Sequence, residues 1–74
     1  MSAVEFDSLI AQLLPKVLAD RELGDGRSFT KLHLNHLWAL SCMYAGECYD
    51  EDLLASRVQN HLPPQVRMVR EVAA

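Results

Sequence analysis

Residues 29–45 read FTKLHLNHLWALSCMYA and form the most apolar part of this 74-residue chain. From Leu37 to Ala45, no side chain is charged, and the hydroxyl groups are limited to those of Ser41 and Tyr44. A helix that is apolar nearly all round must be covered on most of its sides. The stretch therefore predicts a central helix, with the other segments of the chain packed on it.

The segment before this stretch predicts a first helix. Ser2 and Glu5 have the spacing of a capping box, in which each side chain binds the backbone amide of the other residue. Pro15 interrupts the stripe of large apolar residues that follows, but the stripe keeps its helical phase. We expect a kinked helix from residue 3 to about residue 22, and two shorter helices are the alternative. The stripe consists of Phe6, Leu9, Ile10, Leu13, Leu14, Val17 and Leu18.

Turn and capping residues divide the remainder of the chain. The segment 23–27 contains two glycines and predicts a loop, after which Ser28 or Thr30 can cap the central helix. Gly46 is a natural end for that helix, and Asp50 is a good cap for a third helix at 50–62.

Pro63 and Pro64 end that third helix and favour a short fourth helix at 64–72. Its narrow apolar edge would consist of Val66, Val69 and Val72 or Ala73. The predicted fold is all-α, a single domain spanning residues 1–74, with three to four helices around the central apolar helix.

The charge composition indicates which classes of partner this chain could bind. Seven Lys or Arg residues stand against ten Asp or Glu residues, which gives a formal net charge of −3. DNA-binding proteins usually present a basic footprint, whereas the basic residues here are scattered along the chain. No apolar run approaches the roughly 20 residues of a membrane span, and the first residues do not resemble a signal peptide. We expect a cytoplasmic protein without membrane attachment.

The histidines and cysteines do not predict a metal site or a catalytic site. His33 and His36 share a helix face, but Cys42 lies about 240° away around the axis and cannot join them on one ion. We interpret the histidines as a partly exposed pair and Cys42 as a core residue. No nucleophile with a base and an orienting group is recognisable. We therefore expect no enzyme activity, no metal and no cofactor.

The balance of apolar surface predicts protein binding. The third and fourth helices are short, so they leave part of the central helix uncovered. An uncovered remainder rich in Trp, Tyr and Met has the composition of an interface core. We expect a small acidic regulatory or inhibitory protein or adaptor that binds a protein partner or itself, as a homodimer. The candidate partner-binding residues are Leu34, Trp38, Met43, Tyr44 and Tyr49.

Two other functions remain open from the sequence. The segment Leu53–Arg70 resembles the C-terminal end of the Hha/YmoA nucleoid-associated modulators, in Leu53, Val58, Leu62-Pro63, Val66 and a closing Arg. The resemblance covers about a quarter of the chain and implies a transcription-associated modulator that contacts DNA directly or through a DNA-binding partner. Arg67 and Arg70 would then be the nucleic-acid contacts. The third possibility is a carrier or small-ligand module.

Overall fold

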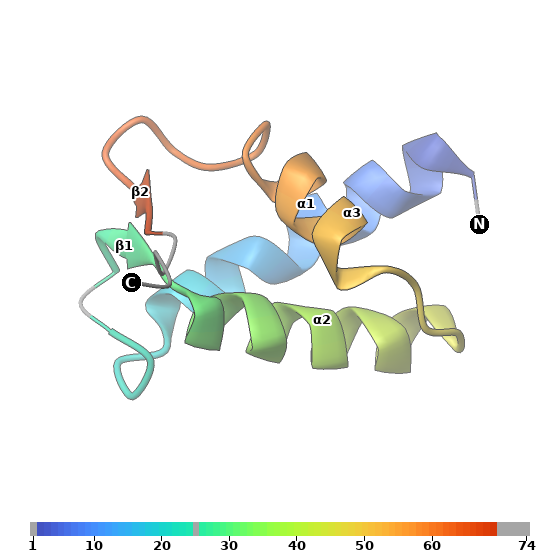
Figure 1. Ribbon diagram of the computed structural model, residues 1–74, viewed down its shortest axis with the longest axis horizontal. Helices are drawn as coiled ribbons and strands as arrows, with labels where there is room; N and C mark the ends of the chain where they lie inside the picture. The colour runs from blue at the N-terminus through green and yellow to red at the C-terminus, as the bar shows by residue number, and fades with distance from the viewer. Residues whose placement is uncertain (1, 25, 70–74) are drawn as a thin grey trace.

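The computed structural model describes residues 2–24 and 26–69. Within them the chain forms a mostly helical, small globule with three helices and one short pair of strands. α1 (Ala3–Ala19) and α2 (Lys31–Ala45) are the long elements, and α3 (Glu51–Val58) packs on both (Figure 1). The strands are β1 (Ser28–Phe29) and β2 (Arg67–Met68).

α1 begins with the predicted capping box. The Glu5 amide donates to Ser2 Oγ at 3.2 Å, and the Ser2 amide donates to Glu5 Oε2 at 3.4 Å. Pro15 lies inside a single helix, so the alternative of two shorter helices is wrong. The helix ends at Ala19, a little earlier than predicted, because the chain turns at Asp20, whose carbonyl accepts the Leu23 amide at 3.1 Å.

α2 has nearly the predicted bounds. Thr30 precedes it in an extended conformation and serves as its N-cap. Gly46 ends it with a left-handed backbone, φ 73°, and donates its amide to the Cys42 carbonyl at 3.0 Å. A left-handed residue after a helix favours glycine because glycine has no Cβ.

α3 is shorter than predicted. Asp50 caps it through Oδ1, which accepts the Asp52 amide at 2.9 Å. The helix ends at Val58, and the carbonyl of Val58 then accepts the amides of His61 and Leu62 at 2.9 and 3.1 Å. Residues 59–62 are therefore a turn that leads into Pro63.

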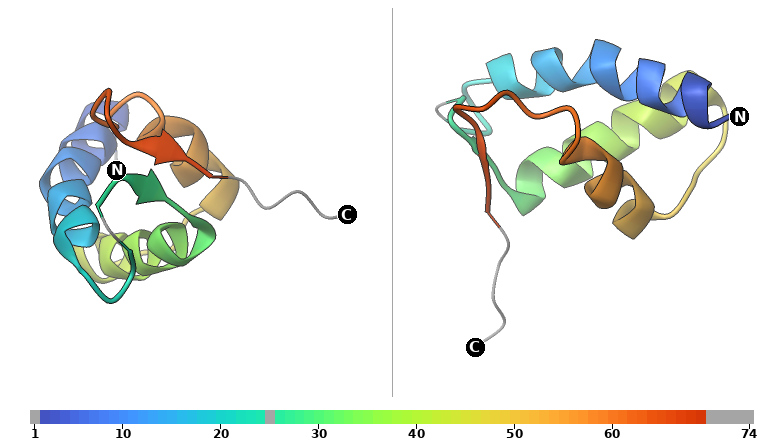
Figure 2. Two further views of the ribbon diagram at one scale, coloured as in Figure 1. Left: turned by 90° about the vertical axis from the view of Figure 1, so that its left-hand side faces the viewer. Right: turned by 90° about the horizontal axis from the view of Figure 1, so that it is seen from above.

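The predicted fourth helix at 64–72 is wrong over residues 64–69, and its remainder lies outside the described residues. This segment instead runs through a turn into β2, which pairs in parallel with β1 (Figure 2). The Arg67 amide donates to the Arg27 carbonyl at 3.0 Å, and the Val69 amide donates to the Phe29 carbonyl at 2.8 Å. These bonds satisfy backbone groups on both segments, which a separate short helix at 64–72 would have left partly to water.

The core lies where the three helices meet β1. α1 supplies most of it, whereas α2 supplies one buried apolar side chain, Leu37. The prediction of a bundle around a central apolar helix is not confirmed, because α2 is covered on one side only. The buried apolar side chains among the described residues are Phe6, Ile10, Leu13, Leu14, Val17, Phe29, Leu37, Leu54 and Val58.

Candidate protein-binding surface

The inner side of α2 is a narrow stripe with two polar members. His33, Leu37 and Ser41 follow one another at every fourth position, and all three are fully buried. Two of their polar atoms form local hydrogen bonds: Ser41 Oγ donates to the Trp38 carbonyl at 2.9 Å, and His33 Nδ1 accepts the Thr30 amide at 3.0 Å. The interpretation of a partly exposed histidine pair is therefore wrong for His33, whereas His36 is exposed.

The outer face of α2 consists of exposed residues and points away from the core. A helix turns by about 100° per residue, so Leu32, Ala39 and Met43 lie within about 40° of one another around the axis. This direction is nearly opposite to that of Leu37 and Ser41. Leu32 is 63% exposed and Met43 is 77% exposed. We define the outer face as Leu32, Asn35, His36, Ala39 and Met43.

The outer face carries no carboxylate and no guanidinium. Lys31 is the one Asp, Glu, Lys or Arg residue in α2, and it lies in the first turn. The first turn has no acidic residue and the last turn has no basic residue. The partial positive charge at the start of α2 and the partial negative charge at its end are thus not offset by charged side chains of these turns.

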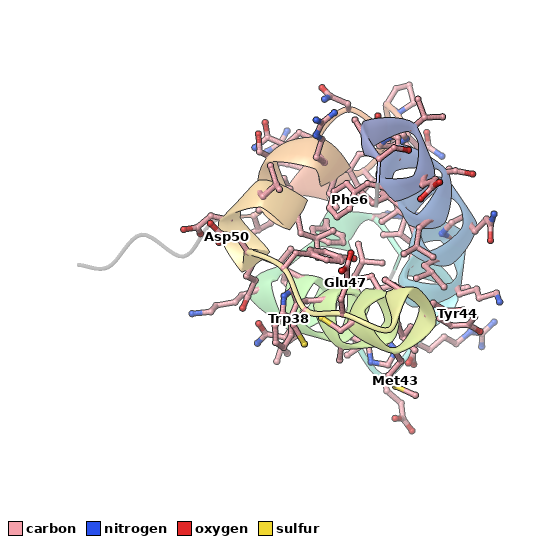
Figure 3. The ribbon with its side chains drawn as sticks, turned by 90° about the vertical axis from the view of Figure 1, so that its right-hand side faces the viewer. Phe6, Trp38, Met43, Tyr44, Glu47 and Asp50 are labelled. Carbon is pink, nitrogen blue, oxygen red and sulfur yellow. The ribbon has the colours of Figure 1, made fainter. Side chains whose placement is uncertain are left out.

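Tyr44 is also exposed, but it lies on the side of α2 that is next to α1. Its ring is 63% exposed, and Lys16 Nζ of α1 is 5.9 Å from the ring centroid. At an exposed site this cation–π contact contributes about 0.5–1 kcal/mol. Figure 3 shows Met43 and Tyr44 at the rim of the molecule, on separate sides of the end of α2.

Trp38 and Tyr49 fasten the loop after α2. Trp38 Nε1 donates to the Tyr49 carbonyl at 2.7 Å. The Tyr49 ring packs edge-on against Phe6 of α1, with 4.7 Å between the ring centroids. Burial raises the pKa of the Tyr49 hydroxyl. The two aromatic residues therefore join α1, α2 and the loop.

The five predicted partner-binding residues fall into two groups. Met43 and Tyr44 are exposed, whereas Leu34, Trp38 and Tyr49 are half-buried and pack against the core. Their role in partner binding stays a prediction. Leu32 and Ala39 were not identified as candidates in the sequence analysis. Leu32 and Ala39 are seven residues apart, and Met43 follows Ala39 by four residues. This spacing places all three on one helix face, opposite to Leu37.

The two cysteines are reduced and lie near each other at the end of α2. Cys42 is half-buried and Cys48 is exposed. Burial, followed by hydrogen bonding to the Cys48 side chain, raises the pKa of the Cys42 thiol. This environment favours the thiol over the reactive thiolate. In the described ranges, no three His, Cys, Asp or Glu side chains form a group suited to a metal ion.

The loop after α1 packs closely on His33. Gly24 has φ 157°, and a Cβ at this position would lie 3.1 Å from His33 Cε1. Beside it is an open depression lined by Leu18, Ala19, Arg21, Gly24 and Gly26. A carrier or small-ligand module would need a pocket in the helical core. This depression lies at the loop instead, so it does not support that function.

The surfaces proposed for nucleic acid carry mixed charge. The first turn of α3 follows Asp50 and contains Glu51 and Asp52, whose carboxylates would repel phosphates. Arg67 is exposed on β2 and not on a helix, and Arg70 lies outside the described residues. Arg57 of α3 instead pairs with Asp7 of α1 at 3.5 Å.

The comparisons with known proteins add no functional information. No family model, no curated protein and no solved structure matches this chain. The resemblance of residues 53–70 to the Hha/YmoA modulators thus has the sequence pattern as its sole support. None of the described helices has the length and apolar content required to cross a membrane.

Proposed function

We propose that this protein is a small acidic regulatory protein that acts by binding another protein, and that the outer face of α2 is its binding surface. The observation that carries this proposal is the exposure of Leu32 and Met43 on one uncharged helix face. Exposed apolar surface on a folded helix has no role in the stability of the monomer, and it is typical of sites that a partner covers.

The energetics favour a modest but specific contact. Burying a Leu or Met side chain completely contributes about 1.5–3 kcal/mol. The small Ala39 between Leu32 and Met43 allows a partner helix to approach closely. Asn35 and His36 flank the apolar positions with hydrogen-bonding groups, as polar residues do at the rim of an interface.

Polar side chains of α1 and of the segment 57–61 form contacts that hold this part of the molecule together. Asp7 accepts from Arg57 Nη1 at 3.5 Å, and its other oxygen lies 3.4 Å from His61 Nε2. These contacts join α1 to α3. These groups are engaged in contacts within the fold, whereas the side chains of the outer face of α2 are exposed.

Variants of equal exposure on two helices test the proposal. Met43→Glu introduces a charge on the outer face, and Val4→Glu introduces the same charge on α1, where Val4 is 78% exposed. Both variants should keep the wild-type circular dichroism spectrum. Binding is measured as self-association by sedimentation velocity and as retention of other proteins on immobilised chain. The proposal requires Met43→Glu to lose binding by at least tenfold while Val4→Glu retains it; equal behaviour of the two variants contradicts it.

A further inference from the structure

We infer that the outer face of α2 is covered by the same face of a second copy, with the two α2 helices antiparallel around a two-fold axis. This inference rests on the proposed function and names its partner. The axis passes midway between His36 and Ala39, so that Leu32 lies against the partner's Met43. His36 then lies against the partner's Ala39, and every contact occurs twice.

The spacing of the outer face fits a second helix of the same kind. Leu32, His36, Ala39 and Met43 follow at intervals of four, three and four residues, which is the repeat of a seam between two paired helices. Ala39 is the smallest of them and lies next to the proposed axis. A small residue there accommodates His36 of the other copy at the usual 8–10 Å between packed helix axes. Among the described residues, no helix or strand covers the side of α2 that faces away from α1 and α3 (Figure 1).

The charges of α2 favour the antiparallel arrangement over the parallel one. Lys31 lies at the positive end of its own helix, where a carboxylate would be favourable, and no charged side chain of the last turn offsets the negative end. In an antiparallel pair, Lys31 lies beside the C-terminal end of the partner's α2, and this contact is repeated by symmetry. In a parallel pair, Lys31 would instead face the partner's Lys31.

The start of α3 is less suited to a two-fold contact than the outer face of α2. The chain has a formal net charge of −3, so two copies repel each other in general. A two-fold contact through the start of α3 would place Asp50, Glu51 and Asp52 near the same residues of the other copy. The outer face of α2 is a place where two acidic copies meet without opposing carboxylates.

The size of the face sets the expected affinity. α2 has 15 residues and is about 22 Å long, at 1.5 Å per residue. A single pair of helices of this length buries less than the roughly 1,600 Å² of a standard interface. The dimer should therefore depend on concentration, with a Kd of about 1–100 μM.

The first experiment is sedimentation equilibrium of the full chain over about 1–500 μM. The wild type should pass from monomer to dimer, Met43→Glu should weaken dimerisation by at least tenfold, and Val4→Glu should not weaken it. A wild type that stays monomeric throughout overturns this inference. If that monomer binds a different protein and Met43→Glu abolishes the binding, the proposed function stands and the second copy alone is rejected.

The second experiment determines the orientation. Leu32→Cys and Met43→Cys are each placed in a Cys42→Ala, Cys48→Ser background and oxidised separately and as a mixture. The antiparallel pair predicts a disulfide dimer in the mixture, between one variant of each kind, and little in either variant alone. A dimer of Leu32→Cys with itself indicates parallel helices and overturns the inference. If the background loses its helix content, a photoreactive residue at position 32 of the natural chain and mass-spectrometric mapping of its crosslink answer the same question.

Discussion

α1 and α2 are similar in length but use their apolar residues in opposite ways. α1 gathers its large apolar side chains on one side, and Phe6, Ile10, Leu13, Leu14 and Val17 are all buried there. α2 distributes them around its circumference, and its buried side contains Leu37 between His33 and Ser41. In α2 the large residues Leu32, Met43 and Tyr44 stay exposed.

The difference shows that hydrophobic content alone does not determine which helix lies inside. The apolar residues of α1 form one continuous stripe, so packing on one side of the helix buries most of its apolar surface. α2 would need neighbours all round, and a chain of this size provides them on one side only. α1 therefore uses its apolar surface to form the core, whereas α2 leaves part of its apolar surface exposed, and we assign this exposed part to binding.

The largest expected effect comes from replacing one large apolar side chain in each helix by alanine, which tests whether the two helices differ in burial as described. Ile10→Ala in α1 removes a fully buried side chain and should lower the free energy of unfolding by about 2–5 kcal/mol. Met43→Ala in α2 should change it by less than about 0.5 kcal/mol. Urea unfolding at low protein concentration, where the monomer prevails, measures both. A loss of stability in Met43→Ala similar to that in Ile10→Ala would show that α2 is covered on its outer side as well.

A smaller effect should come from the loop that fastens the end of α2. Trp38→Phe keeps an aromatic ring but removes the donor to the Tyr49 carbonyl. The partly buried carbonyl loses its partner, and the expected cost is about 1–3 kcal/mol. The loop should also become more accessible to proteolysis near Cys48, which limited digestion followed by mass spectrometry detects. Unchanged stability and digestion would mean that the Phe6–Tyr49 contact holds the loop without the indole.

The ends of the two helices allow a finer comparison. α1 passes into Asp20 with φ −75°, whereas α2 passes into Gly46 with φ 73°. Gly46→Ala should cost about 1–2 kcal/mol through the backbone alone, because the space around Gly46 is open. Gly46→Asn should cost less, because asparagine tolerates the left-handed region better. Thermal unfolding of both variants tests this order, and equal costs would point to a side-chain contact instead.

The smallest expected effect is the dependence of stability on alkaline pH. The raised pKa of Tyr49 means that the folded state holds the phenol proton more tightly than the unfolded chain does. This contribution is fully present below the ordinary pKa of 10.0 and is lost as the pH rises through the raised value of the folded state. Tyr49→Phe should flatten the decline in stability above about pH 10, as measured by urea unfolding at several pH values. A decline as steep as that of the wild type would assign it to other groups.

The sequence predicted the features that depend on neighbouring residues. The capping box at Ser2, the continuity of the first helix through Pro15 and the end of α2 at Gly46 each follow from local backbone chemistry. Met43 and Tyr44, two of the residues expected to remain uncovered, are exposed.

The features that the sequence did not predict depend on contacts between distant segments. The parallel pair of β1 and β2 has two residues in each strand, which is too short for an alternating pattern to be visible. His33 is buried because the loop around Gly24 folds over it, and a histidine at this position has no apolar signal of its own. α3 ends early because the chain must turn to bring residues 67–69 beside β1.

The pairing of β1 with β2 has a consequence for synthesis on the ribosome. The Phe29 carbonyl, just before α2, receives the amide of Val69, which is translated 40 residues later. Long-range pairings of this kind form after local helices, because closing the intervening loop costs entropy. The nascent chain can thus form α1 and α2 early, and the segment before α2 acquires its hydrogen bonds to residues 67–69 only after those residues have been translated.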